Sequence, residues 1–205
     1  MYDLIKLPYQ YNALEPNIDE KTVLIHYERH HRGYLNNLNR LLEEVGYKGN
    51  YTLLELVQNI DEFPMNKRDD ILFNVGGVLN HNLYWLSMSS EKNIIPNGKL
   101  KEAIDNEYGS FENFKNEFIR LANLLKGSGY TFLVVNREDK LEIINTPNQE
   151  TPYVYGLTPI MALDLWEHAY YLSYQNRRSD YINNFFNIVN FKEIGKLYEE
   201  AIQKK

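Results

Sequence analysis

Two long segments with apolar residues at helical spacing constrain the fold of this chain more than any other feature. The first covers residues 20–45, advances in steps of three and four, and is followed by Gly46 as a plausible stop. The second covers residues 68–88 and repeats the spacing through Leu72, Val75, Leu79, Leu83 and Leu86. A short helix at 52–60 and Pro64 lie between them. The pattern therefore predicts two long antiparallel helices, an α-hairpin, in the N-terminal half of the chain.

A pair of adjacent glycines, Gly76 and Gly77, lies in the middle of the second segment. Each costs about 1 kcal/mol relative to alanine in the interior of a helix. Two together indicate that another part of the chain packs very close to the helix backbone at this point.

The chain changes character after the polar segment S-E-K-N-I-I-P-N-G, residues 90–98. Ser110 can cap a helix that Gly127 closes. Two more helical stretches, at about 178–188 and 190–203, are expected at the end of the chain.

Three short apolar runs lie between these helices. Y-T-F-L-V-V-N and L-E-I-I-N-T flank R-E-D-K and are typical of a β-hairpin with a longer loop. The third run, P-I-M-A-L-D, predicts a strand that ends at Asp164. We therefore predict an α+β fold. An N-terminal long α-hairpin domain, residues 1–90, is followed by a C-terminal domain, residues 91–205, of helices around a small three-stranded antiparallel sheet.

Composition excludes several kinds of site and partner. The 205 residues include no cysteine, so a metal would have to bind through His, Asp or Glu. The formal charge of −6 argues against a general affinity for nucleic acid. The N-terminus has no apolar core of the signal-peptide kind, and no stretch approaches about 20 apolar residues. We therefore expect no membrane association and a cytoplasmic protein.

Histidine is scarce, with only five copies: His26, His30, His31, His81 and His168. Each one alone would more often be a hydrogen-bonded core residue than a metal ligand. H-Y-E-R-H is not a zinc-protease motif, because the glutamate of that motif directly follows the first histidine. The single Glu-x-x-His also falls short of the two that a di-iron carboxylate bundle requires.

Four side chains can nevertheless converge on one point. His26 and His81 lie on the two long helices, while Asp164 and His168 lie at a strand end and in the turn that follows it. Three imidazoles and a carboxylate suit iron, manganese or zinc. Aromatic residues would limit water and hold the ligand rings: Tyr34, Trp85, Trp166, Tyr170 and Tyr171. The residues alone predict a metal site without specifying its reaction.

Four motifs, in this order, carry a resemblance to a known family. They are L-P-Y-Q-Y-N-A-L-E-P at 7–16, H-Y-E-R-H-H-R-G-Y-L-N-N-L-N at 26–39, G-G-V-L-N-H-N-L-Y-W at 76–85 and D-L-W-E-H-A-Y-Y at 164–171. Q-N-R-R-S-D-Y follows the last of them. The chain resembles the iron/manganese superoxide dismutases nearly from end to end.

The resemblance implies a role for each residue of the site. The metal ligands would be His26, His81, Asp164 and His168. Tyr34 would stand at the substrate channel, with His30 near its mouth. Gln149 would hydrogen-bond to Tyr34 and to solvent beside the metal. Trp166 would wall the pocket, and Arg178 would attract an anion near the entrance.

The resemblance also implies a homodimer, possibly a tetramer. Glu167 would reach the partner's His168, and Tyr171 would reach the partner's His30. We expect Glu167 to be buried among aromatic residues rather than solvated.

The reaction that the resemblance implies is the conversion of two superoxide anions to oxygen and hydrogen peroxide, by a metal that cycles between +3 and +2. Manganese is favoured over iron as the one ion of each subunit. Gly77 stands where the iron type has a glutamine, and Gln149 supplies that group from the C-terminal half instead. Gly77 would then leave space for Gln149.

Three positions depart from the family pattern. Tyr27 stands where a second histidine often follows the first ligand, and Tyr130 and Phe132 replace the tryptophans of G-S-G-W-x-W. All three keep aromatic bulk, so we expect altered packing and channel shape with the chemistry retained.

A non-haem iron oxygenase and a structural protein are the two alternatives to this interpretation. A non-haem iron oxygenase needs two adjacent open coordination positions, and four protein ligands leave too little room for them. A catalytically silent, metal-stabilised structural protein on the same fold is the non-enzyme alternative.

Overall fold

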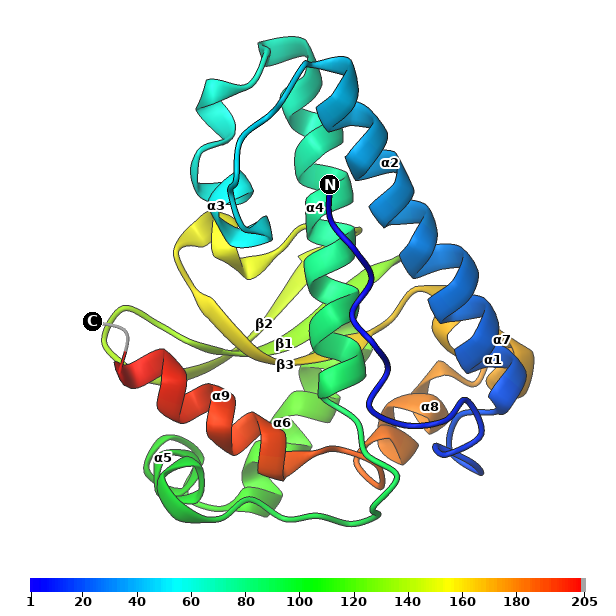
Figure 1. Ribbon diagram of the computed structural model, residues 1–205. Coiled ribbons are helices and arrows are strands. Elements are labelled where there is room, and N and C mark those ends of the chain that lie inside the picture. Colours follow the sequence, from blue (N-terminus) through cyan, green and yellow to red (C-terminus); the bar gives the residue numbers. More distant parts are fainter. Residues whose placement is uncertain (204–205) are drawn as a thin grey trace.

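The computed structural model describes residues 1–203 and contains a helical hairpin packed against a small sheet, with further helices around it (Figure 1). The second helix of the hairpin, α4 (Met65–Leu86), runs antiparallel to the first and contacts the edge strand of the sheet. The predicted fold class is therefore confirmed. Among the helices of the described residues, none is long and apolar enough to cross a membrane.

The first long helical segment is built from three pieces. They are α1 (Glu20–Ile25), a π-helical turn (His26–His31) and α2 (Arg32–Glu44). The side chain of Asp19 caps α1 by accepting a hydrogen bond from the Thr22 amide at 2.9 Å. The sequence pattern did not reveal the π turn. Six residues of wider turn barely change the spacing of apolar residues over the whole segment.

Gly46 ends the first helix, as its sequence position predicts. It adopts a φ of +69°, in the left-handed region that glycine enters without steric cost. The chain then forms α3 (Leu53–Gln58), with a capping box between Thr52 and Glu55, and a 3-10 turn (Ile60–Glu62).

The C-terminal half supplies the sheet and its covering helices. Its helices are α5 (Gly98–Tyr108), α6 (Phe111–Leu124), α7 (Tyr171–Tyr174), α8 (Arg178–Phe185) and α9 (Phe191–Gln203). Ser110 caps α6 as predicted, since its hydroxyl accepts from the Asn113 amide at 3.1 Å. No structure was predicted for the α5 stretch, in which only Leu100 and Ile104 are fully buried.

The sheet contains β1 (Gly129–Val135), β2 (Leu141–Pro147) and β3 (Thr158–Asp164) in the antiparallel order β2-β1-β3. The central strand β1 is completely buried, and β3 nearly so. The register pairs Tyr130 of β1 directly with Asp164, the last residue of β3. Two 3-10 turns, Pro152–Tyr155 and Glu167–Ala169, lie just before and just after β3.

Two hydrophobic clusters hold the elements together. The smaller lies within the hairpin and joins Leu38 of α2 to Leu56 of α3 and Val75 of α4. The larger contains the sheet and its helices, and it also includes Tyr84 and Trp85 at the end of α4. Helix α4 therefore joins the two clusters, and its C-terminal turns are packed into the same core as the sheet.

Gly76 and Gly77 lie where other parts of the chain approach α4 most closely. A Cβ atom at Gly76 would lie 2.1 Å from the Gln149 carbonyl oxygen, and one at Gly77 would lie 2.5 Å from the Tyr34 ring. The predicted close packing is confirmed; the atoms nearest to a Cβ at Gly77 belong to Tyr34, where Gln149 was expected. Gly77 makes room for Tyr34, and Gly76 makes room for Gln149. Adjacent helical residues point about 100° apart and therefore face different neighbours.

We expect Gly76→Ala to lower the free energy of unfolding by about 1–3 kcal/mol, because the added methyl group meets backbone that cannot rotate away. Gly195→Ala in α9 is the matched control, since a Cβ there has open space. It should raise the free energy of unfolding by about 0.5–1 kcal/mol. Urea unfolding of the two variants measures both, and equal effects would contradict the close contact.

Candidate metal centre

Four side chains from four separate elements meet between the hairpin and the sheet. His26 comes from the π turn, His81 from α4, Asp164 from the end of β3 and His168 from the 3-10 turn after it. One potential ligand atom from each lies within 4.8 Å of all the others. The first three residues are buried, and the side chain of His168 is 11% exposed.

One carboxylate oxygen lies at the centre of this cluster. Asp164 Oδ2 is 3.1 Å from His26 Nε2, 3.7 Å from His81 Nε2 and 3.5 Å from His168 Nε2. The other oxygen, Oδ1, accepts a hydrogen bond from the Trp166 amide at 2.8 Å. The short turn after β3 thus fixes the carboxylate and directs Oδ2 toward the three imidazoles.

The hydrogen bonding of His81 fixes its tautomer. His81 Nδ1 lies 2.6 Å from the Gly77 carbonyl oxygen, which can only accept, so Nδ1 carries the proton. The Nε2 atom of the neutral ring therefore presents a lone pair. Such a bond from the far ring nitrogen is the usual support for a histidine ligand.

The donor set fits a cation. Within residues 1–203, none of the Nε2 atoms of His26, His81 and His168 has a hydrogen-bond partner. Buried polar atoms normally have one, and lone pairs directed at one point repel each other. A metal ion between them removes both problems. Nitrogen and carboxylate ligands without sulfur suit manganese, iron or zinc.

Burial sets the charge state of the cluster. It lowers the pKa of His26 to about 4 and that of His81 well below its usual value. Burial acts to raise the pKa of Asp164, but its interactions with His168, and then with His26, hold it well below its usual range. At neutral pH the imidazoles of His26 and His81 are uncharged and the carboxylate is ionised, as metal binding requires.

Gln149 and Tyr34 form a polar pair beside the cluster. Gln149 is fully buried, and its Nε2 donates to the Tyr34 hydroxyl at 3.1 Å. Its backbone carbonyl accepts from Asn80 Nδ2 at 3.1 Å, so the turn after β2 is tied to α4. The Tyr34 ring lies 5.3 Å from the His81 ring. The backbone tether through Asn80 was not apparent from the sequence.

Two further predicted residues pack on His168. The His30 ring stacks on it with centroids 4.0 Å apart, and the Trp166 ring lies almost parallel to it at 5.6 Å. Trp166 Nε1 donates to the Asn148 carbonyl at 2.9 Å, which ties this indole to the turn that carries Gln149. These rings enclose one side of the cluster.

Glu167 and Tyr171 lie beside the cluster but point outward. Glu167 is exposed in the single chain, and Tyr171 is 48% exposed. The expectation that Glu167 is buried among aromatic residues was therefore wrong for one subunit. The residue opens the 3-10 turn after Trp166, and that turn directs the neighbouring His168 inward instead.

Arg178 has a structural set of contacts. Its guanidinium donates to the carbonyl oxygens of Ala122, Leu125 and Gly127 at 3.2, 2.9 and 3.0 Å. These carbonyls belong to the C-terminal end of α6 and the turn after it, where a cation is favourable. The contacts give no support to the predicted attraction of an anion.

The three departures from the family pattern have different environments. The Tyr27 hydroxyl donates to the Ile5 carbonyl at 2.6 Å and so ties down the N-terminal segment. Phe132 stacks on Tyr130 with centroids 5.6 Å apart. The Tyr130 hydroxyl donates to Asp164 Oδ2 at 2.8 Å. We expected altered packing and channel shape there, with the chemistry retained. The missed signal was the strand register, which depends on tertiary structure.

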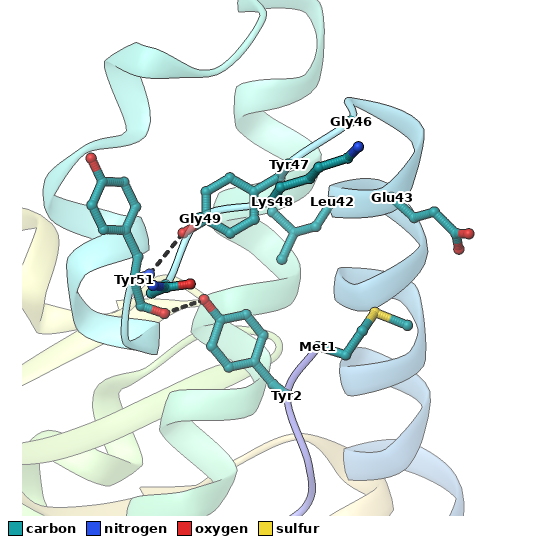
Figure 2. A pocket seen from close by; sticks show the side chains of 10 residues that line it. Met1, Tyr2, Leu42, Glu43, Gly46, Tyr47, Lys48, Gly49 and Tyr51 are labelled. Atoms are coloured by element: carbon teal, nitrogen blue, oxygen red, sulfur yellow. Dashed lines mark hydrogen bonds between the residues drawn. The ribbon is translucent and has the colours of Figure 1, made fainter.

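A surface pocket lies away from the cluster, at the far end of the hairpin. Figure 2 shows that Tyr2 and Tyr47 form its walls, with hydrogen bonds from the Tyr2 hydroxyl to the Tyr51 carbonyl and from the Tyr51 amide to the Tyr47 hydroxyl. Its lining, all within the described part of the chain, contains neither a histidine nor any residue of the cluster. The pocket is therefore separate from the metal centre.

The fold and the cluster together define a class of protein: a helical hairpin and an α+β unit that enclose three histidines and one aspartate able to hold a metal ion. The chain belongs to the iron/manganese superoxide dismutases. Residues 1–89 match the model of the alpha-hairpin domain of that family, and residues 96–197 match the model of its C-terminal domain.

Similar proteins support this assignment over the full length. They include the proteins named superoxide dismutase [Mn] from Listeria monocytogenes, Listeria ivanovii and Listeria innocua. Each is 44% identical to the chain over 200 residues, covering 98% of both sequences. The family that the sequence motifs indicated is therefore confirmed.

The metal-free protein should lose stability as the pH falls from about 6.5 to about 4. Burial lowers the pKa of His31 to about 3 and that of His26 to about 4, whereas an unfolded histidine titrates near 6.5. The unfolded chain then binds protons that the folded chain excludes. Each such histidine lowers the free energy of unfolding by about 1.4 kcal/mol per pH unit within that window.

Urea unfolding of chelator-treated protein at pH 7, 5.5 and 4.5 measures this slope. His31→Gln removes one titrating group and should reduce the slope by about one proton. A free energy of unfolding that does not change between pH 7 and 5 would contradict the expected neutral, buried histidines.

Proposed function

We propose that His26, His81, Asp164 and His168 hold one manganese ion, and that superoxide is the substrate at this centre. The observation that carries the proposal is the convergence of three unpartnered imidazole nitrogens on one buried carboxylate oxygen. The family and the full-length relatives give the activity. The chain is an oxidoreductase that disproportionates superoxide.

In the reaction, two superoxide anions and two protons give one molecule of oxygen and one of hydrogen peroxide. Manganese, when bound, takes up one electron and returns it by alternating between +3 and +2. Zinc suits the same ligands but has no redox chemistry, so it does not support this reaction.

Gln149 and Tyr34 are the proton-handling pair of the proposal. The Tyr34 hydroxyl accepts from Gln149 Nε2, so its own proton remains free to donate toward the cavity. Burial raises the pKa of Tyr34, so this proton stays on the hydroxyl at neutral pH. Two protons are consumed for each peroxide formed, and Tyr34 is the half-buried acid placed to pass them on.

His30 and Trp166 act by packing rather than by binding the metal. Both rings lie on the His168 imidazole and restrict its rotation, which holds Nε2 toward Asp164. They also keep water away from this side of the ligand, where a lower dielectric strengthens every charge interaction.

Manganese is favoured over iron by the space around Gly77. A side chain at this position would collide with the Tyr34 ring, so the glutamine of the iron type does not fit beside Tyr34 in this chain. Gln149 supplies the amide from the C-terminal half. The three Listeria relatives are named as manganese enzymes, which agrees with this choice.

The alternatives have less support. A non-haem iron oxygenase uses two histidines and one carboxylate, whereas a third imidazole occupies this cluster. A silent structural protein has no counterpart among the relatives named above, which are all named as dismutases. A cytoplasmic location and a division into domains at residue 90 remain predictions from the sequence.

We also propose a homodimer formed around the outward side of the cluster. Glu167, Tyr171 and Leu172 are exposed there in the single chain, with Tyr171 at 48% and Leu172 at 51%. His30 and His168 lie just beneath them. A partner that places its own Glu167 against His168 covers these apolar side chains and pairs the exposed carboxylate. Whether two dimers form a tetramer is a further prediction.

The ligand proposal predicts that His81→Ala loses both manganese and activity. Removal of a ligand should weaken manganese binding by more than the roughly 10- to 100-fold that follows loss of a residue supporting a ligand. Elemental analysis and a cytochrome c competition assay measure the two effects. His30→Ala is the matched histidine control: it removes packing on His168 but no ligand, so it should weaken manganese binding by no more than about 10- to 100-fold. Full dismutase activity in the His81→Ala protein would rule out the ligand set.

The dimer proposal predicts that Glu167→Ala shifts the protein toward monomers, because the charge paired with the partner's His168 is lost. Analytical ultracentrifugation over a range of concentrations measures the dissociation constant, which should rise at least about tenfold for loss of a buried charged hydrogen bond. Glu112→Ala, an exposed first-turn acid of α6, is the control. A monomeric wild-type protein would refute the dimer.

A further inference from the structure

Tyr130 provides a hydrogen-bond donor at the centre of the cluster. It lies on the central strand β1, directly across from Asp164 on β3, and both residues are 0% exposed. Its hydroxyl donates to Asp164 Oδ2 at 2.8 Å. The central position of β1, with a strand on each side, fixes the ring in this place.

The oxygen that Tyr130 contacts is the one that faces the histidines. Oδ1 of the carboxylate already accepts from the Trp166 amide, while Oδ2 lies 3.1 Å from His26 Nε2 and 3.5 Å from His168 Nε2. The tyrosine therefore bonds to the proposed ligand atom itself, rather than to the oxygen behind it.

The direction of this hydrogen bond follows from the neighbouring groups. The Tyr130 hydroxyl also lies 3.3 Å from His81 Nδ1, but that nitrogen carries a proton for the Gly77 carbonyl. It cannot accept from a hydroxyl. The carboxylate oxygen is thus the acceptor for the tyrosine proton, in a charge-assisted bond that is stronger than a neutral one.

This donor is a property of the present chain. Tyr130 occupies the first tryptophan position of the G-S-G-W-x-W pattern, so the chain places a phenol hydroxyl where the pattern has an indole. Phe132, at the second position, stacks on Tyr130 and has no polar group to compete with it.

We propose that Tyr130 is a positioning residue that favours the +2 over the +3 state of the bound metal through its hydrogen bond to Asp164 Oδ2. The inference rests on the proposed metal site. A hydrogen-bond donor partly neutralises the negative charge of a carboxylate oxygen. The carboxylate then stabilises a bound cation less than it would without the donor. The more highly charged ion loses more of this stabilisation, because the electrostatic energy scales with its charge. The reduction potential of the metal is therefore higher with the hydroxyl than without it.

Tyr130→Phe tests the proposal, because it removes the hydroxyl and keeps the ring. The purified manganese-loaded variant and wild type are equilibrated with redox mediators at a series of fixed potentials. The visible absorption of the oxidised metal then gives the ratio of oxidised to reduced sites. At a given potential this ratio should rise about tenfold in the variant, which corresponds to about 59 mV for a one-electron couple.

Tyr84→Phe is the matched control. Tyr84 is equally buried, and its hydroxyl pairs with that of Tyr181 at 3.0 Å rather than with the Asp164 carboxylate. Loss of this hydroxyl should leave the ratio within about a factor of two of wild type, which is about 18 mV. Equal shifts in the two variants would show a general packing effect and overturn the proposal.

Other outcomes also decide the matter. A Tyr130→Phe protein that holds manganese at the wild-type potential overturns the tuning role and leaves the metal site intact. A folded variant that binds no manganese overturns it as well, since the hydroxyl would then serve retention. If the variant does not fold, a crystal structure of the manganese-loaded wild type decides, because a hydroxyl-to-Oδ2 distance above about 3.5 Å excludes the bond. Wild-type protein without bound manganese would instead refute the proposed function.

Discussion

The structure depends on a single buried carboxylate oxygen that faces three imidazole nitrogens. An ionised carboxylate is costly to bury, and three imidazole lone pairs directed at one of its oxygens add repulsion. A cation at the centre relieves this repulsion. Asp164 therefore has to be fixed from several sides, and it is, by the Trp166 amide, by the Tyr130 hydroxyl and by the Tyr181 hydroxyl on its backbone carbonyl at 2.9 Å. The two histidines of the hairpin, His26 and His81, are then brought to this fixed carboxylate by the packing of the hairpin on the sheet.

Helix α4 brings the two halves together at this point. Its two mid-helix glycines allow Tyr34 and the turn that carries Gln149 to reach its backbone, and the Gly77 carbonyl orients the His81 ring. Asn80 holds the same turn by its backbone. The two glycines lower the stability of the helix, but they allow Gln149 and Tyr34 to lie beside the cluster. Substitutions on this face of α4 affect packing and chemistry together.

Tyr130 shows how a family site can be altered without a change of ligands. The strand register places residue 130 opposite Asp164 whatever the side chain is, so the identity of that residue decides what the ligand oxygen meets. The Tyr130 hydroxyl lies 2.8 Å from Asp164 Oδ2 and acts directly on the charge of this carboxylate oxygen. The residue at this position can therefore act on the carboxylate without any change in the four converging side chains.

The sequence by itself determined the long helices, the hairpin strands and the identity of the four converging residues, because apolar spacing and motif order are local properties of the chain. Only the tertiary structure decided that Gly76 meets the Gln149 backbone carbonyl and Gly77 the Tyr34 ring, that Arg178 binds the carbonyls at the end of α6, and that Glu167 is exposed in the single chain. The α5 helix and the π turn around His26 were also missed. Each of these depends on which surfaces meet across the fold, and contacts between distant segments leave no periodic signal in the sequence.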